Sequence, residues 1–336
     1  MQININSNSS GSRSIYLPLL LLILLPFNLK SQQTSTFNYL RNYTAKEYNA
    51  VPQNWAIVQD KRGLMYFGNN KGVLEYDGVT WNLISIPNER IRSLTIDDND
   101  LIYVGGDGQI GYLAPDSVGE MQYFSLLKFI NEQDRHFSDV WNALLTDQGV
   151  YFQTSNKIFR WNGKKMKVWN AREPRDFHVM FYMPPLDKKE YPGNIYIRQR
   201  ERGLMKMDGD SLVLVPGGAL FARHAIYSML PFNSPSGTSS IPQSKEQILI
   251  ISRDIGLFLI DRRKNLQNTA MYPFRCPAND LFLNYIGYKG TVLPGLTKSD
   301  ADNNNYSIGT LGGGSVVINS KGEFIRFLNK NSGLQD

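Results

Sequence analysis

Short hydrophobic runs separated by polar turns fill most of this chain, and no helical periodicity of comparable length competes with them. Residues 55–86 contain the runs WAIVQD, LMYFGNN, VLEYDG and VTWNLISI, with Lys, Arg and Gly between them. Runs of this length, rich in Val, Ile, Tyr and Trp and bounded by turn residues, are typical of β-strands joined by hairpins. The stretch therefore predicts four short antiparallel strands in a meander.

The same pattern recurs five more times, over residues 91–127, 140–170, 178–215, 225–274 and 282–328. Repeats of about 40–50 residues with four strands each are typical of β-propeller blades. The sequence therefore predicts an all-β fold, a β-propeller of four-stranded antiparallel blades with about six blades present. The last residues, NKNSGLQD, fall where a linker into the next blade is expected. We therefore expect the chain to be truncated at its C-terminal end and to form part of a seven-bladed ring.

The longest apolar run, SIYLPLLLLILLPF at residues 14–27, follows Arg13 and precedes polar sequence. It is short for a membrane span, and its basic flank is typical of a secretory signal. We assign residues 1–31 to a signal peptide and residues 32–336 to an exported, periplasmic domain. An uncleaved signal anchor is the alternative.

Composition restricts the chemistry that this domain can perform. A single cysteine, Cys276, excludes a disulfide framework and a multi-cysteine zinc site, and the three histidines lie far apart. The net charge is +6, but no block of Lys or Arg collects it, so the sequence does not favour direct nucleic-acid binding. We expect no metal and no cofactor.

Motifs that could indicate catalysis have simpler explanations. The glycines at 106, 108 and 111 satisfy G-x-G-x-x-G, but they join two predicted strands and lack the helix that a dinucleotide site needs. The acidic run 97–100 lacks the spacing of a calcium loop and predicts a hairpin turn. No pair of carboxylates stands out as a glycosidase acid and nucleophile. We therefore expect the chain not to be an enzyme.

Whole segments of the sequence resemble a known family. RNYTAKEYNAVPQNWAIVQDKRGLMYFGNNKGVLEYDGVTW (41–81) resembles the first blade of the two-component regulator-propeller sensors of Bacteroidetes, and IYVGGDGQIGYLAPD (102–116) resembles their second blade. NSGLQD resembles their inter-blade linker, and the likeness covers about residues 37–336. In that family, two propellers precede a triple-tyrosine β-sandwich, a transmembrane helix and a kinase or helix-turn-helix output. The resemblance implies a propeller sensor whose C-terminal propeller, triple-tyrosine and membrane/output domains belong to a full-length protein.

Aligning the blades on one another selects candidate ligand contacts. Asn69 lies at the turn between the second and third strands of its blade, and Arg200 and Arg253 occupy similar positions in neighbouring blades. Rotation about a common axis would place such residues in a ring, where guanidinium groups suit carboxylates or sulfates and stack on sugars. The candidate ligand-binding residues are Asn69, Asp107, Thr154, Arg200, Glu201 and Arg253. Solvated loop arginines are the alternative.

The five tryptophans, Trp55, Trp81, Trp141, Trp161 and Trp169, could stack on sugars, although their recurrence along the strands favours packing between blades. The function expected is a periplasmic ligand-sensing input module of a membrane-bound transcriptional regulator, with an oligosaccharide or another small polar or anionic ligand. A stand-alone secreted glycan- or protein-binding propeller is the first alternative. A propeller polysaccharide lyase or glycosidase is the second.

Overall fold

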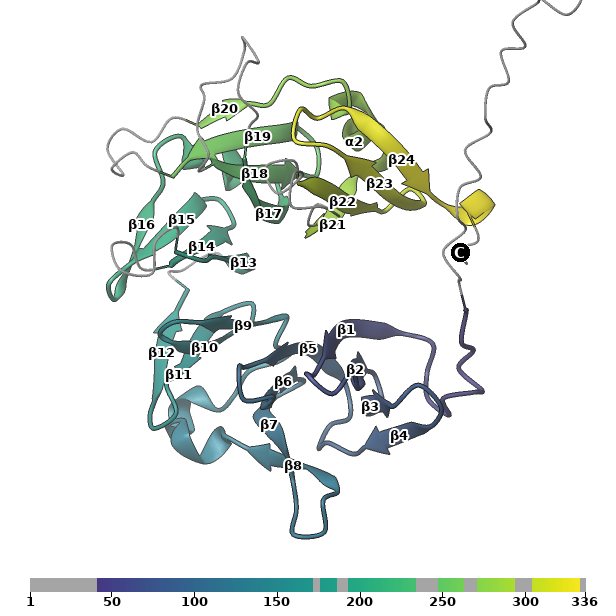
Figure 1. Cartoon of the computed structure of the whole chain (residues 1–336). Helices are drawn as coiled ribbons and strands as arrows, with labels where there is room; N and C mark the ends of the chain where they lie inside the picture. The colour runs from purple at the N-terminus through teal and green to yellow at the C-terminus, as the bar shows by residue number, and fades with distance from the viewer. Residues whose placement is uncertain are drawn as a thin grey trace, which may run out of the picture. The chain divides into compact units, whose positions relative to one another are not determined.

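The computed structural model describes residues 41–171, 176–185, 193–233, 247–262, 271–293 and 304–332. The predicted signal peptide, residues 1–31, lies outside these ranges. The described residues from Asn42 onward form six sheets of four strands, arranged in a ring (Figure 1). The chain is thus a six-bladed β-propeller, and the predicted fold class is confirmed.

Each blade is a meander of four antiparallel strands in sequence order. Blade 1 comprises β1 (Asn54–Gln59), β2 (Met65–Asn69), β3 (Gly72–Tyr76) and β4 (Trp81–Ile84). Blade 2 comprises β5 (Ile91–Ile96), β6 (Ile102–Gly106), β7 (Gln109–Pro115) and β8 (Met121–Ser125). Blade 3 comprises β9 (Asn142–Thr146), β10 (Gly149–Gln153), β11 (Lys157–Trp161) and β12 (Met166–Asn170).

The remaining three blades repeat this order. Blade 4 comprises β13 (Phe177–Met183), β14 (Asn194–Gln199), β15 (Gly203–Asp208) and β16 (Ser211–Leu214). Blade 5 comprises β17 (Ile226–Phe232), β18 (Gln247–Ser252), β19 (Gly256–Asp261) and β20 (Met271–Pro273). Blade 6 comprises β21 (Gly287–Leu293), β22 (Asn305–Thr310), β23 (Gly314–Ile318) and β24 (Phe324–Leu328).

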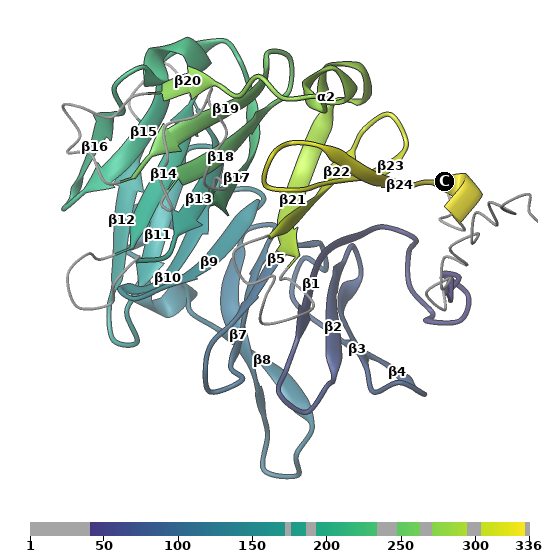
Figure 2. The ribbon, with the colours of Figure 1, turned by 45° about the horizontal axis from the view of Figure 1, so that its top comes forward.

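The first strand of each blade lies innermost. Successive first strands pack side by side from β1 through β5, β9, β13 and β17 to β21, and the fourth strands lie at the outer edge of the ring (Figures 1 and 2). Because each first strand pairs antiparallel with its second strand, its start lies beside the turn between the second and third strands. One face of the ring therefore carries the starts of the first strands together with these turns.

The hydrophobic core is divided among the seams between blades. One cluster joins Tyr103 and Ile110 of blade 2 to Phe152 and Phe159 of blade 3, and another joins Phe232 of blade 5 to residues of blade 6. Five such clusters fill the five successive seams. A blade buries its second face only against its neighbour, which explains why the apolar runs of the repeat are nearly continuous.

Turn residues act as the sequence predicts. Asp60 and Asp97 follow the first strands of their blades, and the Oδ1 atom of Asp97 accepts hydrogen bonds from the backbone N–H groups of Asn99 and Leu101. This is an Asx turn, so the acidic run at 97–100 is a hairpin. The G-x-G-x-x-G motif likewise joins β6 to β7, with Gly108 at a φ of 61°. Both hairpin predictions are confirmed.

The sixth repeat, predicted over residues 282–328, begins with a helix. The short helix α2 (Asn279–Tyr285) precedes the first strand of this blade, β21. Phe282 is fully buried within this helix, in the seam between blades 5 and 6. Short 3-10 helices also occur at Leu127–Phe129, Glu132–Asp134, Gly218–Ala222 and Lys330–Ser332. None of the described helices is both long enough and apolar enough to cross a membrane.

Candidate functional site

A β-bulge at the start of the first strand recurs in most blades. The pairing between first and second strands shifts at Trp55, at Arg92, at His178, at Tyr227 and, in blade 6, between Gly287 and Gly290, where Tyr288 lies. Blade 3 pairs without a shift, and Trp141 stands directly before its first strand. A bulge leaves one residue unpaired and redirects its side chain. These six residues therefore occupy one level of the ring, at the end of the innermost strands, and we call them the mouth residues.

In blades 1 to 3 the mouth residues stack on one another, with an arginine between two tryptophans. The guanidinium carbon of Arg92 lies 3.9 Å from the ring centroid of Trp55 and 4.9 Å from that of Trp141. The three residues come from three successive blades, so Arg92 of blade 2 contacts a tryptophan of each neighbouring blade. The Arg92 side chain is only 11% exposed. This sandwich joins the three blades by cation–π contacts.

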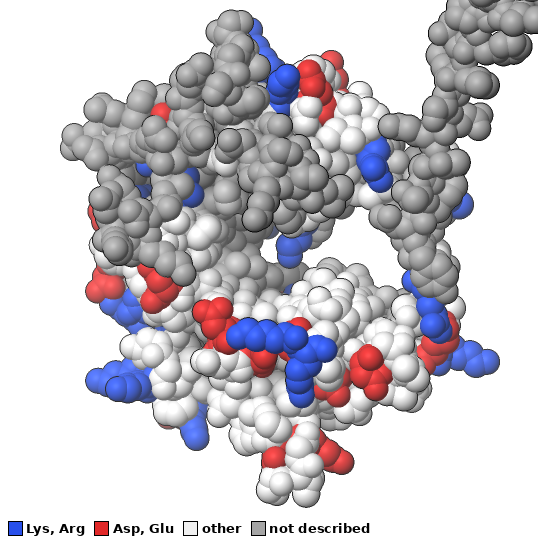
Figure 3. Space-filling model, in the orientation of Figure 1, with Lys and Arg blue, Asp and Glu red and all other residues white. Residues whose placement is uncertain are grey.

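Carboxylates neutralise the arginines of this half. Asp139 accepts from Nε of Arg90 at 3.0 Å, and its second oxygen lies 3.3 Å from Nε of Arg92. Arg90 also donates to Asp107 at 2.7 Å. Acidic and basic side chains accordingly lie intermingled on this face, below the central hollow in Figure 3. Arg90 and Arg92 thus each have a carboxylate partner within the protein.

In blades 4 to 6 the mouth residues form a second series, made of aromatic ring contacts. The ring centroids of His178 and Tyr227 lie 5.6 Å apart, and those of Tyr227 and Tyr288 lie 5.0 Å apart. Tyr288 is 45% exposed, so this series offers an aromatic face to solvent. Together the two series supply Trp, Arg, His and Tyr side chains to one end of the central channel.

Arg200 and Arg253 stand beside this second series. The backbone N–H of Arg200 donates to the Asp176 carbonyl, and that of Arg253 donates to the Ala225 carbonyl, each at 2.9 Å. These carbonyls belong to the residues two positions before His178 and Tyr227. Both arginines are exposed, and within the described residues neither side chain has a hydrogen-bonding or ionic partner. The pair is therefore a cationic feature of this face that remains available to a ligand.

The strand register corrects the alignment that selected these residues. The residues that pair with the start of the first strand are Asn69, Gly106, Gln153, Gln199, Ser252 and Thr310. Thr154, Arg200 and Arg253 come one residue later. The backbone N–H of Asp107 donates to the Arg90 carbonyl in the same way as those of Arg200 and Arg253 donate to theirs. Asp107, Arg200 and Arg253 are therefore true equivalents, whereas Asn69 is not one of them.

Two predicted contacts instead have internal partners. Asn69 is fully buried, and its Nδ2 donates to the Val51 carbonyl and to Oδ1 of Asn54. Thr154 is fully buried too, and its hydroxyl bonds within its own turn, to Asn156 and Lys157. Both side chains are used to hold the chain in place, because buried polar groups need partners.

The other two predicted contacts are at the surface. Asp107 is bound to Arg90, with 37% of its side chain exposed. Glu201 follows Arg200 in the turn between β14 and β15, where it adopts a φ of 57°. A non-glycine residue in this left-handed region is uncommon, and such positions concentrate at functional turns. The predicted set thus brings together Arg200, Glu201 and Arg253, with Asp107 on a different blade.

Burial and positive charge act on His178. Burial, together with the charges of Arg198, Arg200 and Arg253, lowers the pKa of His178 to about 4. The guanidinium of Arg198 is buried and donates to the carbonyls of Phe221 and Ala222, each at 3.0 Å. His178 is therefore neutral at pH 7 in a positive environment.

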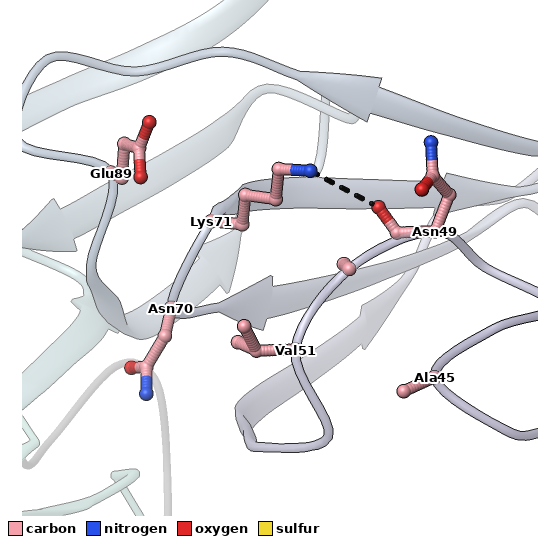
Figure 4. A pocket seen from close by; sticks show the side chains of 7 residues that line it. Ala45, Asn49, Val51, Asn70, Lys71 and Glu89 are labelled. Atoms are coloured by element: carbon pink, nitrogen blue, oxygen red, sulfur yellow. Dashed lines mark hydrogen bonds between the residues drawn. The ribbon is translucent and has the colours of Figure 1, made fainter.

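A separate shallow pocket of about 370 Å³ lies on blade 1, between residues 45–51 and the turn after β2 (Figure 4). The Lys71 ammonium faces the Asn49 carbonyl across it, at 3.4 Å. Apart from Glu89 and Lys71, its lining side chains are small or neutral. Its polar lining residues are Asn49, Asn70, Lys71 and Glu89, and the Lys71 ammonium is already bonded to the Asn49 carbonyl.

No group of three or more His, Cys, Asp and Glu side chains that could hold a metal occurs within the described ranges. Cys276 lies in the loop before α2, and burial raises the pKa of its thiol to about 11. The thiolate, which is the nucleophilic form, is therefore scarce at neutral pH.

Sequence reasoning missed the mouth residues Arg92, His178, Tyr227 and Tyr288. Each stands one or two positions into a first strand, where a side chain would ordinarily alternate between core and solvent. A bulge cannot be read from strand composition. The recurrence of a large or charged residue at the same place in each repeat was the signal that could have found them.

Comparison with known proteins agrees with the fold. No family model matches the chain, and no curated protein matches it in sequence. The WD40 β-propeller domain of Doa1 superposes with a TM-score of 0.54, at 11% identity over 82% of each chain. A streptogramin B lyase superposes with a TM-score of 0.53, at 11% identity over 84% of this chain and 83% of the lyase.

The extracellular domain of a hybrid two-component system from B. thetaiotaomicron is also similar, with a TM-score of 0.38 and 16% identity. The match covers 80% of this chain and 38% of that domain. At such identities the likeness of the Doa1 propeller and of the streptogramin B lyase shows the fold alone, and β-propellers host many unrelated activities. The function must therefore be argued from the residues of the mouth.

Proposed function

We propose that this propeller is a periplasmic ligand-sensing input module of a membrane-bound regulator, and that it binds ligand at the mouth residues of blades 4 to 6. The proposal rests on one observation above all. Arg200 and Arg253 lie without side-chain partners, among the described residues, beside the aromatic series His178, Tyr227 and Tyr288. Guanidinium groups beside aromatic faces suit a ligand that combines a polar or anionic group with a ring.

Two further features support the proposal. The predicted signal peptide would export the propeller, and the segments quoted above resemble the first two blades of regulator-propeller sensors. A sensor of this kind needs a binding face and no catalytic group. We therefore propose binding without catalysis, and that output domains of the full-length protein carry the signal. A free secreted propeller would use the same face.

Binding is tested with Arg200→Ala combined with Arg253→Ala. The ligand panel contains neutral and acidic mono- and oligosaccharides, screened by thermal shift and measured by calorimetry. We expect an anionic member to bind and the double variant to lose about tenfold or more in affinity. The matched control is Lys164→Ala with Lys165→Ala, which removes the same charge at the exposed turn between β11 and β12. Equal affinity in the two double variants would remove the arginines from the site.

Catalysis is tested with the same panel. Incubation of the protein with each oligosaccharide, followed by chromatography of the products, should leave the chain lengths unchanged. Cleavage by hydrolysis or elimination would contradict the proposal and favour a lyase or glycosidase.

Export is tested with alkaline phosphatase, which is active only when exported, fused after residue 336. We expect activity from the fusion of residues 1–336 and little from the same fusion without residues 2–31. Equal activity in the two fusions would contradict the assignment of the signal peptide and of the compartment.

A further inference from the structure

The imidazole of His178 lies in an unusual setting within the mouth. It occupies the bulge of β13, with one neighbouring ring, Tyr227, at a centroid distance of 5.6 Å. Its Nδ1 atom is buried and has no hydrogen-bond partner among the described residues. A buried polar atom without a partner costs free energy, and such atoms are uncommon in folded proteins.

The tautomer of His178 follows from its unpartnered nitrogen. The backbone of Ile226 favours the protonated ring. Because Nδ1 has no hydrogen-bond partner among the described residues, we infer that Nε2 carries the ring proton. The neutral ring therefore carries its lone pair at Nδ1, and a second proton would enter there.

Three arginines act electrostatically on the His178 ring. Arg198, on β14, and Arg200 and Arg253, on the turns after β14 and β18, all disfavour the protonated ring. Three described acidic residues lie near these arginines. Asp254 acts on Arg198 and is bonded to His224 at 2.9 Å. Asp176 accepts from the backbone N–H of Arg200 through its carbonyl, and Glu201 follows Arg200 in the turn. Within the described part of the chain, none of the three carboxylates forms an ion pair with Arg200 or Arg253.

We propose that an anionic group binds between Arg200 and Arg253 and that its binding draws a proton from solvent onto Nδ1 of His178. The inference rests on the proposed function, because it uses the same face of the ring, and it adds His178 as a proton-linked residue. The ligand class is a sulfate or carboxylate carried on a ring, whose face packs against Tyr227 and Tyr288.

The direction of the pH dependence follows from the charges. In the free protein His178 is neutral above pH of about 4. A bound anion offsets the field of the arginines and raises the pKa of His178, so the complex holds a proton that the free protein lacks. Affinity therefore increases as the pH falls from 7 towards 5. Burial is the largest cause of the lowered pKa, and an anion removes only the contribution of the charges.

Linkage sets the size of the effect. If the bound anion raises the pKa of His178 by one unit, affinity increases about twofold between pH 7 and pH 5. Restoring the ordinary value of 6.5 would increase affinity about 20-fold, which is an upper limit because burial continues to lower the pKa in the complex. The measured ratio therefore reports how far the anion offsets the arginines.

The test uses glucose 6-sulfate, whose charge is constant over this pH range, with benzenesulfonate and inorganic sulfate as alternative sources of the anion and glucose as the neutral control. Affinities are measured by calorimetry at pH 5, 6 and 7, in buffers of different ionisation enthalpy that report proton uptake. The variants are His178→Gln and, if it unfolds, His178→Asn. His136→Gln, at an exposed histidine between blades 2 and 3, is the matched control.

We expect a wild-type affinity ratio between pH 5 and pH 7 of about 2–20, with uptake of part of a proton. His178→Gln should bind with a flat pH profile, and His136→Gln should keep the wild-type profile. Equal profiles in wild type and His178→Gln would overturn the linkage, while a loss of binding in the Arg200/Arg253 double variant would still uphold the site. Absence of binding by every anion in the wild-type protein would overturn both.

Discussion

The Asp139 carboxylate is expected to be the most important charged group in the seam between blades 2 and 3. It is 10% exposed and contacts Arg90 at 3.0 Å and Arg92 at 3.3 Å. Asp139→Asn preserves the shape of the side chain and removes its charge. Arg92, 11% exposed, then remains buried without a counter-ion. Breaking a buried ion pair in this way typically costs about 3–5 kcal/mol.

Two contacts reduce that cost here. Arg90 keeps Asp107 at 2.7 Å, and Arg92 keeps its two indole neighbours, which contribute about 0.5–2 kcal/mol in such contacts. We therefore expect Asp139→Asn to destabilise the propeller by about 2–3 kcal/mol. Asp107→Asn is the matched control. Its pair is 41% and 37% exposed, so we expect a loss of about 0–1 kcal/mol.

Urea unfolding at pH 7, followed by tryptophan fluorescence, measures both variants. A double-mutant cycle with Arg92→Met sharpens the test, because methionine can keep the apolar contact between Trp55 and Trp141 without the charge. We expect the double variant to recover about 1–2 kcal/mol relative to the sum of the single variants. Equal losses for Asp139→Asn and Asp107→Asn, or additive behaviour in the cycle, would refute the reasoning.

Three further predictions concern stability and reactivity. Gly203→Ala should destabilise the fold by at least ~2 kcal/mol in urea unfolding, because Gly203 has a φ of +113° and an added Cβ would lie 2.2 Å from the Gly218 carbonyl oxygen. Gly163→Ala, at a φ of +87° in open space, should cost only about 1–2 kcal/mol, and equal losses would contradict this argument. Cys276 should react with iodoacetamide at pH 8 about 100-fold more slowly in the native than in the unfolded protein, because burial raises its pKa to about 11; similar rates would show that the thiol is accessible. Protonation of His178 below pH 6.5 favours the unfolded state, because burial and nearby charge lower its pKa in the native protein to about 4. The free energy of unfolding should therefore be constant with respect to this group above pH 6.5 and fall by about 1–2 kcal/mol as the pH falls towards 4. Unfolding of His178→Gln, measured as a function of pH, should lack this decline.

The two halves of the mouth differ in how their charged side chains are held. In blades 1 to 3, Arg92 is held by Trp55, Trp141 and Asp139, so this half is a fixed part of the ring. In blades 4 to 6, the turns that carry Arg200 and Arg253 contain three residues between paired positions, compared with two in blades 1 and 2. The longer turns carry the arginines that the proposal assigns to the ligand. Binding there would add an interaction that links neighbouring blades across their seam.

The sequence by itself determined the blades. Strand length, turn glycines and Asx turns are local features, so residues 55–86 and their repeats predicted four-stranded meanders whose limits agree closely with the observed strands. The same local logic identified the G-x-G-x-x-G motif as a turn between β6 and β7. The alignment of the repeats also selected Arg200 and Arg253. It matched them to Asn69, although the structural equivalents of Asn69 are the residues one position earlier, Gln199 and Ser252.

Tertiary structure alone decided which side chains meet. The positions of Trp55, Arg92 and Trp141 are set by two bulges and by the packing of three blades, and Asp139 reaches Arg90 across 49 residues of sequence. Neither the bulges nor these long-range contacts can be predicted from the alternation of apolar and polar residues. The mouth of the channel exists only once the ring has formed, because each blade contributes a single residue to it.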